Sequence, residues 1–409
     1  MQILLYCFLF TASWNSTFQI GSFSLPFIFS FLYSLSLFFK SDIEMNLNKL
    51  KFVILPILVS TIYFISSSLI NNHEKSLSYT IAYILIPLAY CYIPSSVKFN
   101  FDEVNKLLKG FFFGSFLVAF ICIFEFLIRY YLGFDITYFL LHAKENYAFT
   151  LTNKGHVLFR SRAFSTEPII TGLFLSVCTQ YFFIDLARYI QYSIKIFSFK
   201  MLKKVFCIWF LIIALLTTGS ASSIVVICSG LFLIILKNFY YIIKNFFYEK
   251  NNFRYFITIE IFFILLIPLI ILCLYYEPFK TSIQIVFDKI FLNSNYNSVA
   301  ARTSVINDYF TLFLNDPFGL SGSVGRYSKD GSAVNWYLTL LGDLGLIGTF
   351  FTLFPLIVFC FLGIKSTFKK GLDSFDKFSL LLIPILGLFF HGTFYASPLW
   401  PLIILIQYL

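Results

Sequence analysis

Charged residues are scarce in this sequence. Only 12% of the 409 residues are Asp, Glu, Lys or Arg, whereas 59% are hydrophobic and the mean hydropathy is +0.83. A soluble domain carries about 25% charged residues, so this chain has too little polar surface to form a water-soluble globule. We therefore predict an all-α, polytopic membrane protein that forms a single integral membrane domain over residues 1–409.

Cofactor and nucleotide signatures are also missing. The eight cysteines lie in or beside apolar runs, which is typical of small buried hydrophobic residues, and none forms a CxxC motif or a cluster with histidine at metal-ligand spacing. The sequence contains no P-loop and no GxGxxG motif, which excludes nucleotide hydrolysis within this chain. We expect no metal or other cofactor and no disulfide framework.

What the sequence does contain is a succession of apolar runs. A membrane crossing needs about 20 apolar residues to span about 30 Å. By this criterion we predict twelve spans, the first retained because it lacks a basic n-region. They cover residues 2–18, 23–39, 52–70, 77–94, 110–132, 167–187, 205–219, 221–243, 256–276, 335–361, 378–392 and 394–409.

The net charge of +10 indicates the orientation of these spans. Short cytoplasmic loops collect Lys and Arg, and every second predicted loop is rich in them. One example is the loop between the second and third spans, which carries Lys40, Lys49 and Lys51. This pattern predicts that both termini are cytoplasmic. Because membrane topology explains the positive charge and lipid contact explains the aromatic content of 21%, we expect lipids, not nucleic acid, as partners.

Two predicted extracytoplasmic loops are far longer than connectors. Residues 133–166 form the first, and residues 277–334 form the second, where apolar residues at helical spacing precede the breaker Asp316-Pro317. Links between helices in bundles usually take about 2 to 8 residues, and long loops on a rigid scaffold often carry function. A functional site is therefore expected in these loops.

The segment RSRAFSTEP, residues 160–168, joins the first loop to the sixth span. Guanidinium groups bind phosphate oxygens in a bidentate manner, and the positive end of the following helix also favours anions. Arg160, Arg162 and Glu167 therefore form a candidate headgroup site, with Ser165 or Thr166 expected to cap a helix whose first turn holds Pro168. The alternative is that the arginines only contact lipid phosphates.

The second loop holds further cations. Arg302, Arg326 and Lys329 stand near Asp308, Asp316 and Asp330 on a Gly-rich segment. Arginines from two loops on one side of the membrane could converge on one diphosphate. The alternative is a solvated loop with ordinary ion pairs.

The start of the tenth span is rich in glycine. Gly342, Gly345 and Gly348 leave one helix face bare for a close neighbour, and Asp343 is expected about two turns inside the membrane. The alternative for Asp343 is a structural carboxylate on a packing face. Asn335 and Trp336 are expected at the membrane interface. Elsewhere, Glu125 and Arg129 are four residues apart on the fifth span and are expected to neutralise each other.

These features together resemble a bacterial O-antigen polymerase of the Wzy type, within the superfamily that also contains O-antigen ligases. The stretch at residues 162–168 is similar to an Arg-x-Phe-x-x-Glu-Pro motif before a mid-chain span, and 218–220 resembles a Thr-Gly-Ser turn, although Ala221 stands where Arg is often found. Asn335, Gly345 and Gly348 keep a ligase spacing, but Val334 occupies the position of the ligase histidine. This departure favours the polymerase branch.

The resemblance implies metal-independent glycosyl transfer outside the cytoplasmic membrane, from a glycan on undecaprenyl diphosphate to another lipid-linked repeat unit. It implies a chain-length regulator as a partner. Arg162 and Arg302 are the first candidates to hold the departing diphosphate, with Arg160 and Arg326 next, and Glu167 is the candidate base. Asp330 and His156 are reserve bases, Asn335 belongs to the substrate site, and Tyr309, Phe318, Tyr327 and Trp336 offer faces to sugar rings.

Three other functions stay open. The nearest is an O-antigen ligase. A flippase-type transporter of lipid-linked oligosaccharide also needs many spans and cations, but transporters often show internal repeats, and we find no convincing repeat. A scaffold subunit would tolerate replacement of the loop arginines.

Overall fold

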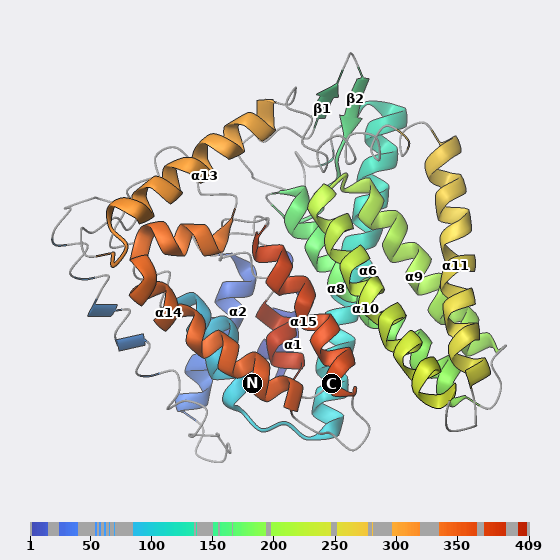
Figure 1. Cartoon of the computed structure of the whole chain (residues 1–409), viewed down its shortest axis with the longest axis horizontal. Coiled ribbons are helices and arrows are strands. Elements are labelled where there is room, and N and C mark those ends of the chain that lie inside the picture. Colours follow the sequence, from blue (N-terminus) through green and yellow to red (C-terminus); the bar gives the residue numbers. More distant parts are fainter. Residues whose placement is uncertain are drawn as a thin grey trace.

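The computed structural model describes residues 2–14, 24–39, 85–134, 150–153, 156–165, 167–193, 198–246, 252–276, 297–319, 335–365, 372–389 and 400–406, with a few single positions between them. Helices dominate this part of the chain (Figure 1). They are α1 (Gln2–Phe10), α2 (Leu25–Phe38), the π-helix η1 (Leu88–Tyr92), α5 (Ile93–Ser96), α6 (Phe101–Leu132), α8 (Pro168–Tyr192), α9 (Phe199–Thr217), α10 (Ala221–Phe246), α11 (Asn252–Tyr275), α13 (Asn297–Asn315), α14 (Trp336–Lys365), α15 (Ser374–Phe389) and α16 (Trp400–Leu405).

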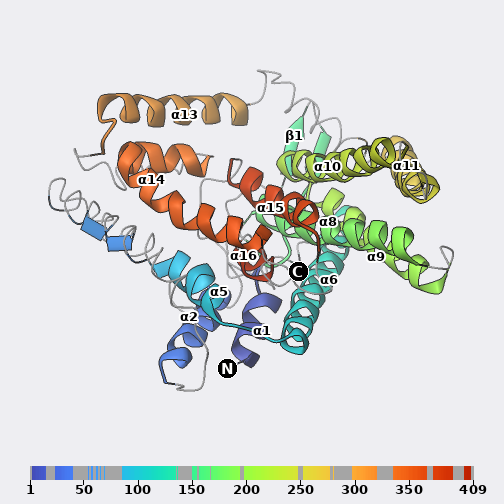
Figure 2. The ribbon, with the colours of Figure 1, turned by 60° about the horizontal axis from the view of Figure 1, so that its bottom comes forward.

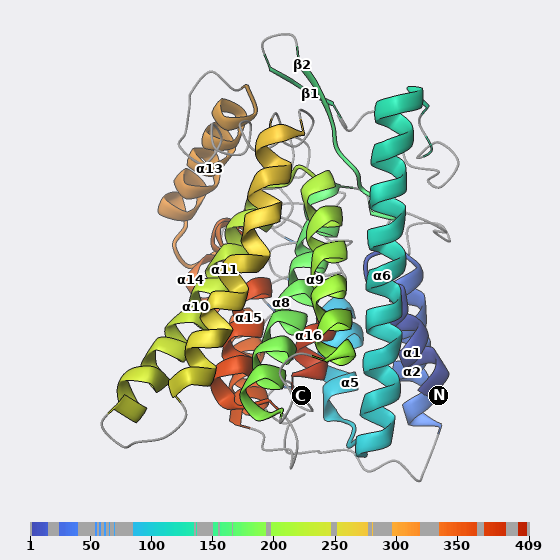
Figure 3. The same ribbon diagram turned by 90° about the vertical axis from the view of Figure 1, so that its right-hand side faces the viewer.

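The predicted all-α class is confirmed for the described residues, which also contain one short hairpin. Strands β1 (Thr150–Asn153) and β2 (His156–Phe159) pair antiparallel, with Thr150 opposite Phe159. The hairpin projects from one end of the bundle (Figures 1 and 3). We call this the hairpin end, and it also contains the C-terminal end of α6, the start of α8 and the turn between α9 and α10.

The chain forms a helical membrane protein. Four described helices are long and apolar enough to cross a membrane, and their spans are Asp102–Leu132, Pro168–Tyr192, Ala221–Lys244 and Trp336–Lys365. Large hydrophobic side chains are exposed along these helices, including Phe113, Phe120 and Phe232. Such exposure would be unfavourable in water and is expected of surfaces that face lipid.

Most predicted spans coincide with helices, but their lengths differ. Helix α6 begins at Phe101, well before the predicted residue 110, because Asn100 and Glu103 form a reciprocal capping box. Helix α1 ends at Phe10, and Thr11 donates a side-chain hydrogen bond to the carbonyl oxygen of Cys7. The predicted span 52–70 lies almost wholly outside the described residues.

Helix α8 is the centre of the bundle. It packs against α6, α9, α10, α11 and α15, as the views in Figures 2 and 3 show. Most of its residues are buried, including the polar Thr179 and Gln180. Close packing is possible because Gly172 faces Ser223 on α10 and Gly230 faces Gln180. The start of α8 is consequently fixed at the hairpin end.

Helix α14 is broken at Gly345, which has φ 61° and ψ −169°. The arm before the break lies alongside α13, and the part after it runs along the bundle (Figures 1 and 2). From Leu346 to Lys365 the second part has about 20 residues and is about 30 Å long, which matches the hydrocarbon core of a bilayer. The continuous helix within the predicted span 335–361 therefore begins only after Gly345.

Candidate functional site

The candidate site begins on the last two turns of α6. Glu125 and Arg129 lie four residues apart there, and both side chains are buried, Glu125 with an exposed fraction of 1%. A buried carboxylate needs hydrogen bonds or an opposite charge to offset its lost hydration. The partners come from the RSRAFSTEP segment, a contact that sequence spacing alone did not predict.

That segment is the extended stretch after β2, which passes back between α6 and the turn joining α9 to α10. Ser161 donates its backbone N–H to the carbonyl oxygen of Thr217 at 3.0 Å and its hydroxyl to that of Cys122 at 2.8 Å. Arg160 Nε donates to the carbonyl oxygen of Thr218 at 3.0 Å. These three bonds fix the segment at the hairpin end.

Glu125 holds the next two residues. Its Oε2 accepts the backbone N–H of Arg162 and that of Ala163, both at 3.0 Å. Ala163 has φ 48°, in the left-handed region that residues other than glycine rarely adopt. The carbonyl oxygen of Arg162 in turn accepts the hydroxyl of Thr171 at 2.6 Å and the N–H of Ser165 at 3.0 Å. Hydrogen bonds from Glu125 on α6 and from Thr171 on α8 therefore fix the conformation of this loop.

Arg162 itself is buried, with an exposed fraction of 3%. Burial lowers the pKa of its guanidinium to about 10, a shift that the Glu125 carboxylate opposes and the Arg129 charge increases. Arg162 stays charged at neutral pH. Two guanidinium groups and one carboxylate thus share the interior at the hairpin end, with Arg160 half-buried beside them.

Glu167 is the N-cap of α8, and Pro168 occupies the first turn as predicted. The predicted capping by Ser165 is wrong, because the Ser165 hydroxyl donates instead to the carbonyl oxygen of Ser13 at 2.7 Å. Thr166 lies outside the described residues. Glu167 is half-buried and lies at the positive terminus of α8.

The second predicted group is described only in part. Arg302 lies on α13, within the helix that the spacing predicted, whereas Arg326, Tyr327, Lys329 and Asp330 lie outside the described residues. His156 is on β2. The predicted convergence of the two loops on one diphosphate therefore stays a prediction.

The residues at the start of α14 have structural partners. Asn335 Oδ1 accepts the N–H of Leu338 at 3.2 Å, which is a helix cap. Trp336 is buried and packs edge-on against Trp400, with ring centroids 6.4 Å apart. Trp336 was expected at the membrane interface with a face open to sugar. The structure places it in the core instead.

The glycine face of α14 does receive a close neighbour, although not another span. Gly342 faces the ring of buried Tyr309 on α13, and Gly345 faces the backbone of Pro317–Gly319. Asp343, also buried, lies on the arm before the break at Gly345. The expectation that Asp343 lies two turns inside a continuous span is corrected by that break.

Sequence reasoning missed the link between Glu125 and the Arg162 loop. It treated Glu125 and Arg129 as a self-neutralising pair, whereas Glu125 also accepts two backbone hydrogen bonds from the loop. Thr217 and Thr218, at the turn that was singled out only for its resemblance to a Thr-Gly-Ser motif, contribute the carbonyl groups that hold Ser161 and Arg160. The signal that could have found this link is an acid placed deep in an apolar span, which requires an interior partner.

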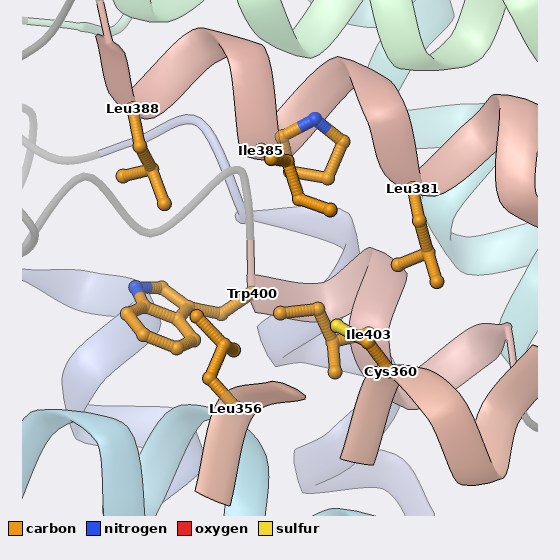
Figure 4. A pocket seen from close by; sticks show the side chains of 8 residues that line it. Leu356, Cys360, Leu381, Ile385, Leu388, Trp400 and Ile403 are labelled. Carbon is orange, nitrogen blue, oxygen red and sulfur yellow. The ribbon is translucent and has the colours of Figure 1, made fainter. Parts of the chain in front are cut away.

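An apolar pocket lies between α14, α15 and α16 (Figure 4). The side chains of Leu356, Cys360, Leu381, Pro384, Ile385, Leu388, Trp400 and Ile403 line it.

Among the described residues, no group of three or more His, Cys, Asp or Glu side chains is arranged to hold a metal ion. The chemistry available at the hairpin end is therefore that of guanidinium groups, a carboxylate and a helix N-terminus, which suits an anion.

No protein-family model matches this chain, and no curated protein matches it.

Proposed function

We propose that this protein polymerises undecaprenyl-diphosphate-linked oligosaccharide repeat units into a surface polysaccharide, as a Wzy-type O-antigen polymerase. The observation that carries the proposal is the loop with Arg160 and Arg162, held by Glu125 at the end of α6. A lipid diphosphate presents a dense negative charge close to the membrane surface. Fixed guanidinium groups beside a helix N-terminus are the groups that this charge requires.

The distribution of charge along the bundle supports an extracytoplasmic site. The helix ends and loops opposite the hairpin end carry basic residues, which include Lys106, Lys109, Arg188, Lys200, Lys203, Lys204, Lys244, Arg254 and Lys365. By the positive-inside rule that end faces the cytoplasm. The hairpin end, with the site, then faces outward, and we retain twelve spans, two large extracytoplasmic loops and cytoplasmic termini as part of the proposal.

The proposed reaction is an inverting glycosyl transfer. The acceptor hydroxyl oxygen attacks the anomeric carbon of the donor glycan, and the bond from that carbon to the diphosphate breaks. The electron pair leaves on the lipid diphosphate, whose charge Arg160 and Arg162 stabilise, and Glu167 takes the hydroxyl proton. Preorganised charges act most strongly in a site that excludes water, and the burial of Arg162 provides such surroundings.

Surface-glycan size tests the proposal. In the producing strain lacking this gene, wild type should restore a ladder of chain lengths, whereas Arg160→Ala and Arg162→Ala should leave a single repeat unit on the acceptor. Lys244→Ala, at the other end of the bundle, is the matched control and should restore the ladder. All variants are compared at equal protein levels, with their thermal stability in detergent measured in parallel.

The other outcomes identify the alternatives. Long chains that stay on the carrier lipid would indicate a ligase, and repeat units that accumulate on the cytoplasmic side would indicate a transporter. A full ladder from both arginine variants would overturn the diphosphate site. Arg160→Ala is the more informative of the two if Arg162→Ala is unstable, because Arg160 is only half-buried.

A further inference from the structure

Helix α13 presents three distinct faces, one of which packs against α14. On this first face, buried Tyr309 lies over Gly342, where a Cβ atom would approach its ring to 2.7 Å. This contact fixes the rotation of α13 about its own axis. The contact therefore also determines the directions in which the other two faces of α13 point.

The second face is an exposed apolar stripe. Ile306, Phe310 and Leu314 are spaced four residues apart and have exposed fractions of 39%, 52% and 58%. The third face, next to the stripe, is polar and exposed, and it consists of Ser304, Asn307, Thr311 and Asn315. A helix with an apolar and a polar face side by side is the pattern of a helix that lies in the plane of a membrane interface.

The apolar stripe is continuous with the lipid-facing surface of a spanning helix. After α13 the chain turns at Pro317–Gly319, and the Pro317 carbonyl oxygen accepts the N–H of Leu346 at 2.8 Å. Phe318, in this turn, is exposed, and so are Leu346 and Phe350 just below the break in α14. A row of exposed apolar side chains thus runs from α13 onto α14.

The depth of this junction is set by the length of α14. The part after Gly345 is about 30 Å long, enough to cross the hydrocarbon core once. If this part crosses the core from one side to the other, Gly345 and the turn docked against it lie close to the boundary between acyl chains and headgroups. Helix α13 is at the periphery of the described bundle in both Figure 1 and Figure 3.

We propose that α13 lies in the membrane interface at the hairpin end, with Ile306, Phe310 and Leu314 inserted among the lipid acyl chains. The segment predicted as part of an extracytoplasmic subdomain is then a membrane-surface helix that anchors the second long loop to the bilayer. This inference does not depend on the proposed reaction.

Site-specific photocrosslinking tests the proposal on the full chain. Benzoylphenylalanine is placed singly at Phe310 or Leu314 in the stripe, and at Asn307 or Thr311 on the polar face. The protein is reconstituted in vesicles of phosphatidylethanolamine and phosphatidylglycerol, irradiated, and examined by mass spectrometry for attached lipid. Positions 310 and 314 should give several-fold more lipid adduct than positions 307 and 311.

Equal lipid adduct at all four positions would overturn the proposal, and so would a crosslinked dimer at 310 or 314, which would make the stripe a contact between two copies. A second measurement guards against misfolding caused by the bulky probe. Beyond the labelling of the eight native cysteines, measured on wild type, Thr311→Cys should react with a membrane-impermeant maleimide in intact vesicles, whereas Phe310→Cys should react only after detergent is added. Rapid reaction of both would equally refute membrane insertion.

Discussion

The carboxylate of Glu125 holds the backbone of Arg162: Oε2 lies 3.0 Å from the Arg162 nitrogen and 3.0 Å from that of Ala163. Glu125 is on α6 and Arg162 is in the loop before α8, so this contact joins a spanning helix to the candidate site. It also maintains a left-handed backbone at Ala163 that the sequence would not adopt readily on its own.

Removing the Glu125 carboxylate should destabilise the protein. Glu125→Ala leaves two buried N–H donors without their acceptor, at a cost of about 1–3 kcal/mol each. The midpoint of thermal unfolding in detergent, followed with a dye that reacts with newly exposed cysteines, should fall clearly. Glu260→Ala, at an exposed position on α11, is the control and should leave the midpoint nearly unchanged. Equal midpoints for the two variants would show that the contact contributes no stability.

Sequence reasoning predicted the helical membrane class because composition and long apolar runs depend on no tertiary contact. It placed Arg160, Arg162 and Glu167 at the start of α8 correctly, since Pro168 is a local signal for a helix start. It could not predict that Glu125 holds the loop. That contact depends on how a segment 37 residues away folds back, which spacing does not encode.

The same limit explains the error at α14. Three glycines at helical spacing indicate a bare helix face for a close neighbour, which the structure shows, but periodicity cannot reveal that the helix is interrupted. Helix α14 is interrupted at Gly345, where the turn at Pro317–Gly319 approaches its backbone. Trp336, likewise, has the sequence context of an interface anchor, but it is buried in the core, where Trp400 packs against it from a distant part of the sequence.

Substitution of Gly345 should separate α13 from α14. In Gly345→Ala the new Cβ atom would lie 2.3 Å from the backbone nitrogen of Gly319, and the residue has φ 61°. Gly133→Ala is a close control, since Gly133 has φ 65° but nothing within 4 Å of an added Cβ. A left-handed alanine at Gly133, where ψ is 9°, costs about 1–2 kcal/mol. Gly345 has ψ −169°, a region essentially restricted to glycine, and its Cβ position is blocked, so the thermal midpoint of Gly345→Ala should fall well below that of Gly133→Ala. Equal thermal midpoints for the two variants would show that the contact between Gly345 and the Pro317–Gly319 turn adds no stability.

Truncation of the Trp336 side chain should lower the stability of the protein. Trp336 is buried against Trp400 and Tyr337, and removing a buried aromatic side chain costs about 3–5 kcal/mol. Trp336→Ala should therefore lower the thermal midpoint strongly, whereas Trp336→Phe should retain most of the stability and the glycan ladder. If Trp336→Phe were stable but failed to restore the ladder, the indole would have a role in the substrate site after all.

An ion cluster lies at the end of the bundle that is proposed to face the cytoplasm, and its members should depend on one another. Lys237 on α10 donates to Asp373 Oδ2 at 2.5 Å and to Asp376 Oδ1 at 2.6 Å. Lys237 and Asp376 are buried, whereas Asp373 is exposed. Lys237→Met would leave carboxylates without their cation, which costs about 3–5 kcal/mol for a buried pair.

Neutralising the acids as well should recover much of that loss, because apolar groups of similar volume can replace a buried ion pair at little cost. The triple variant Lys237→Met, Asp373→Asn, Asp376→Leu should therefore unfold at a higher temperature than Lys237→Met alone. Lys244→Met, near the end of α10, is the control and should shift the midpoint little. A triple variant no more stable than the single one would show that the three charges act independently.

The same cluster predicts a dependence of stability on pH. Burial raises the pKa of Asp373, but the hydrogen bonds from Lys237 and from the Asp376 backbone lower it by a larger amount. The net shift of the Asp373 pKa is therefore downward. A carboxyl with a depressed pKa in the folded state stabilises above its ordinary pKa and loses this contribution as the pH falls through the folded value. Wild type should therefore lose stability below about pH 4 more steeply than Asp373→Asn, and parallel acid profiles of the two proteins would refute the contribution of Asp373.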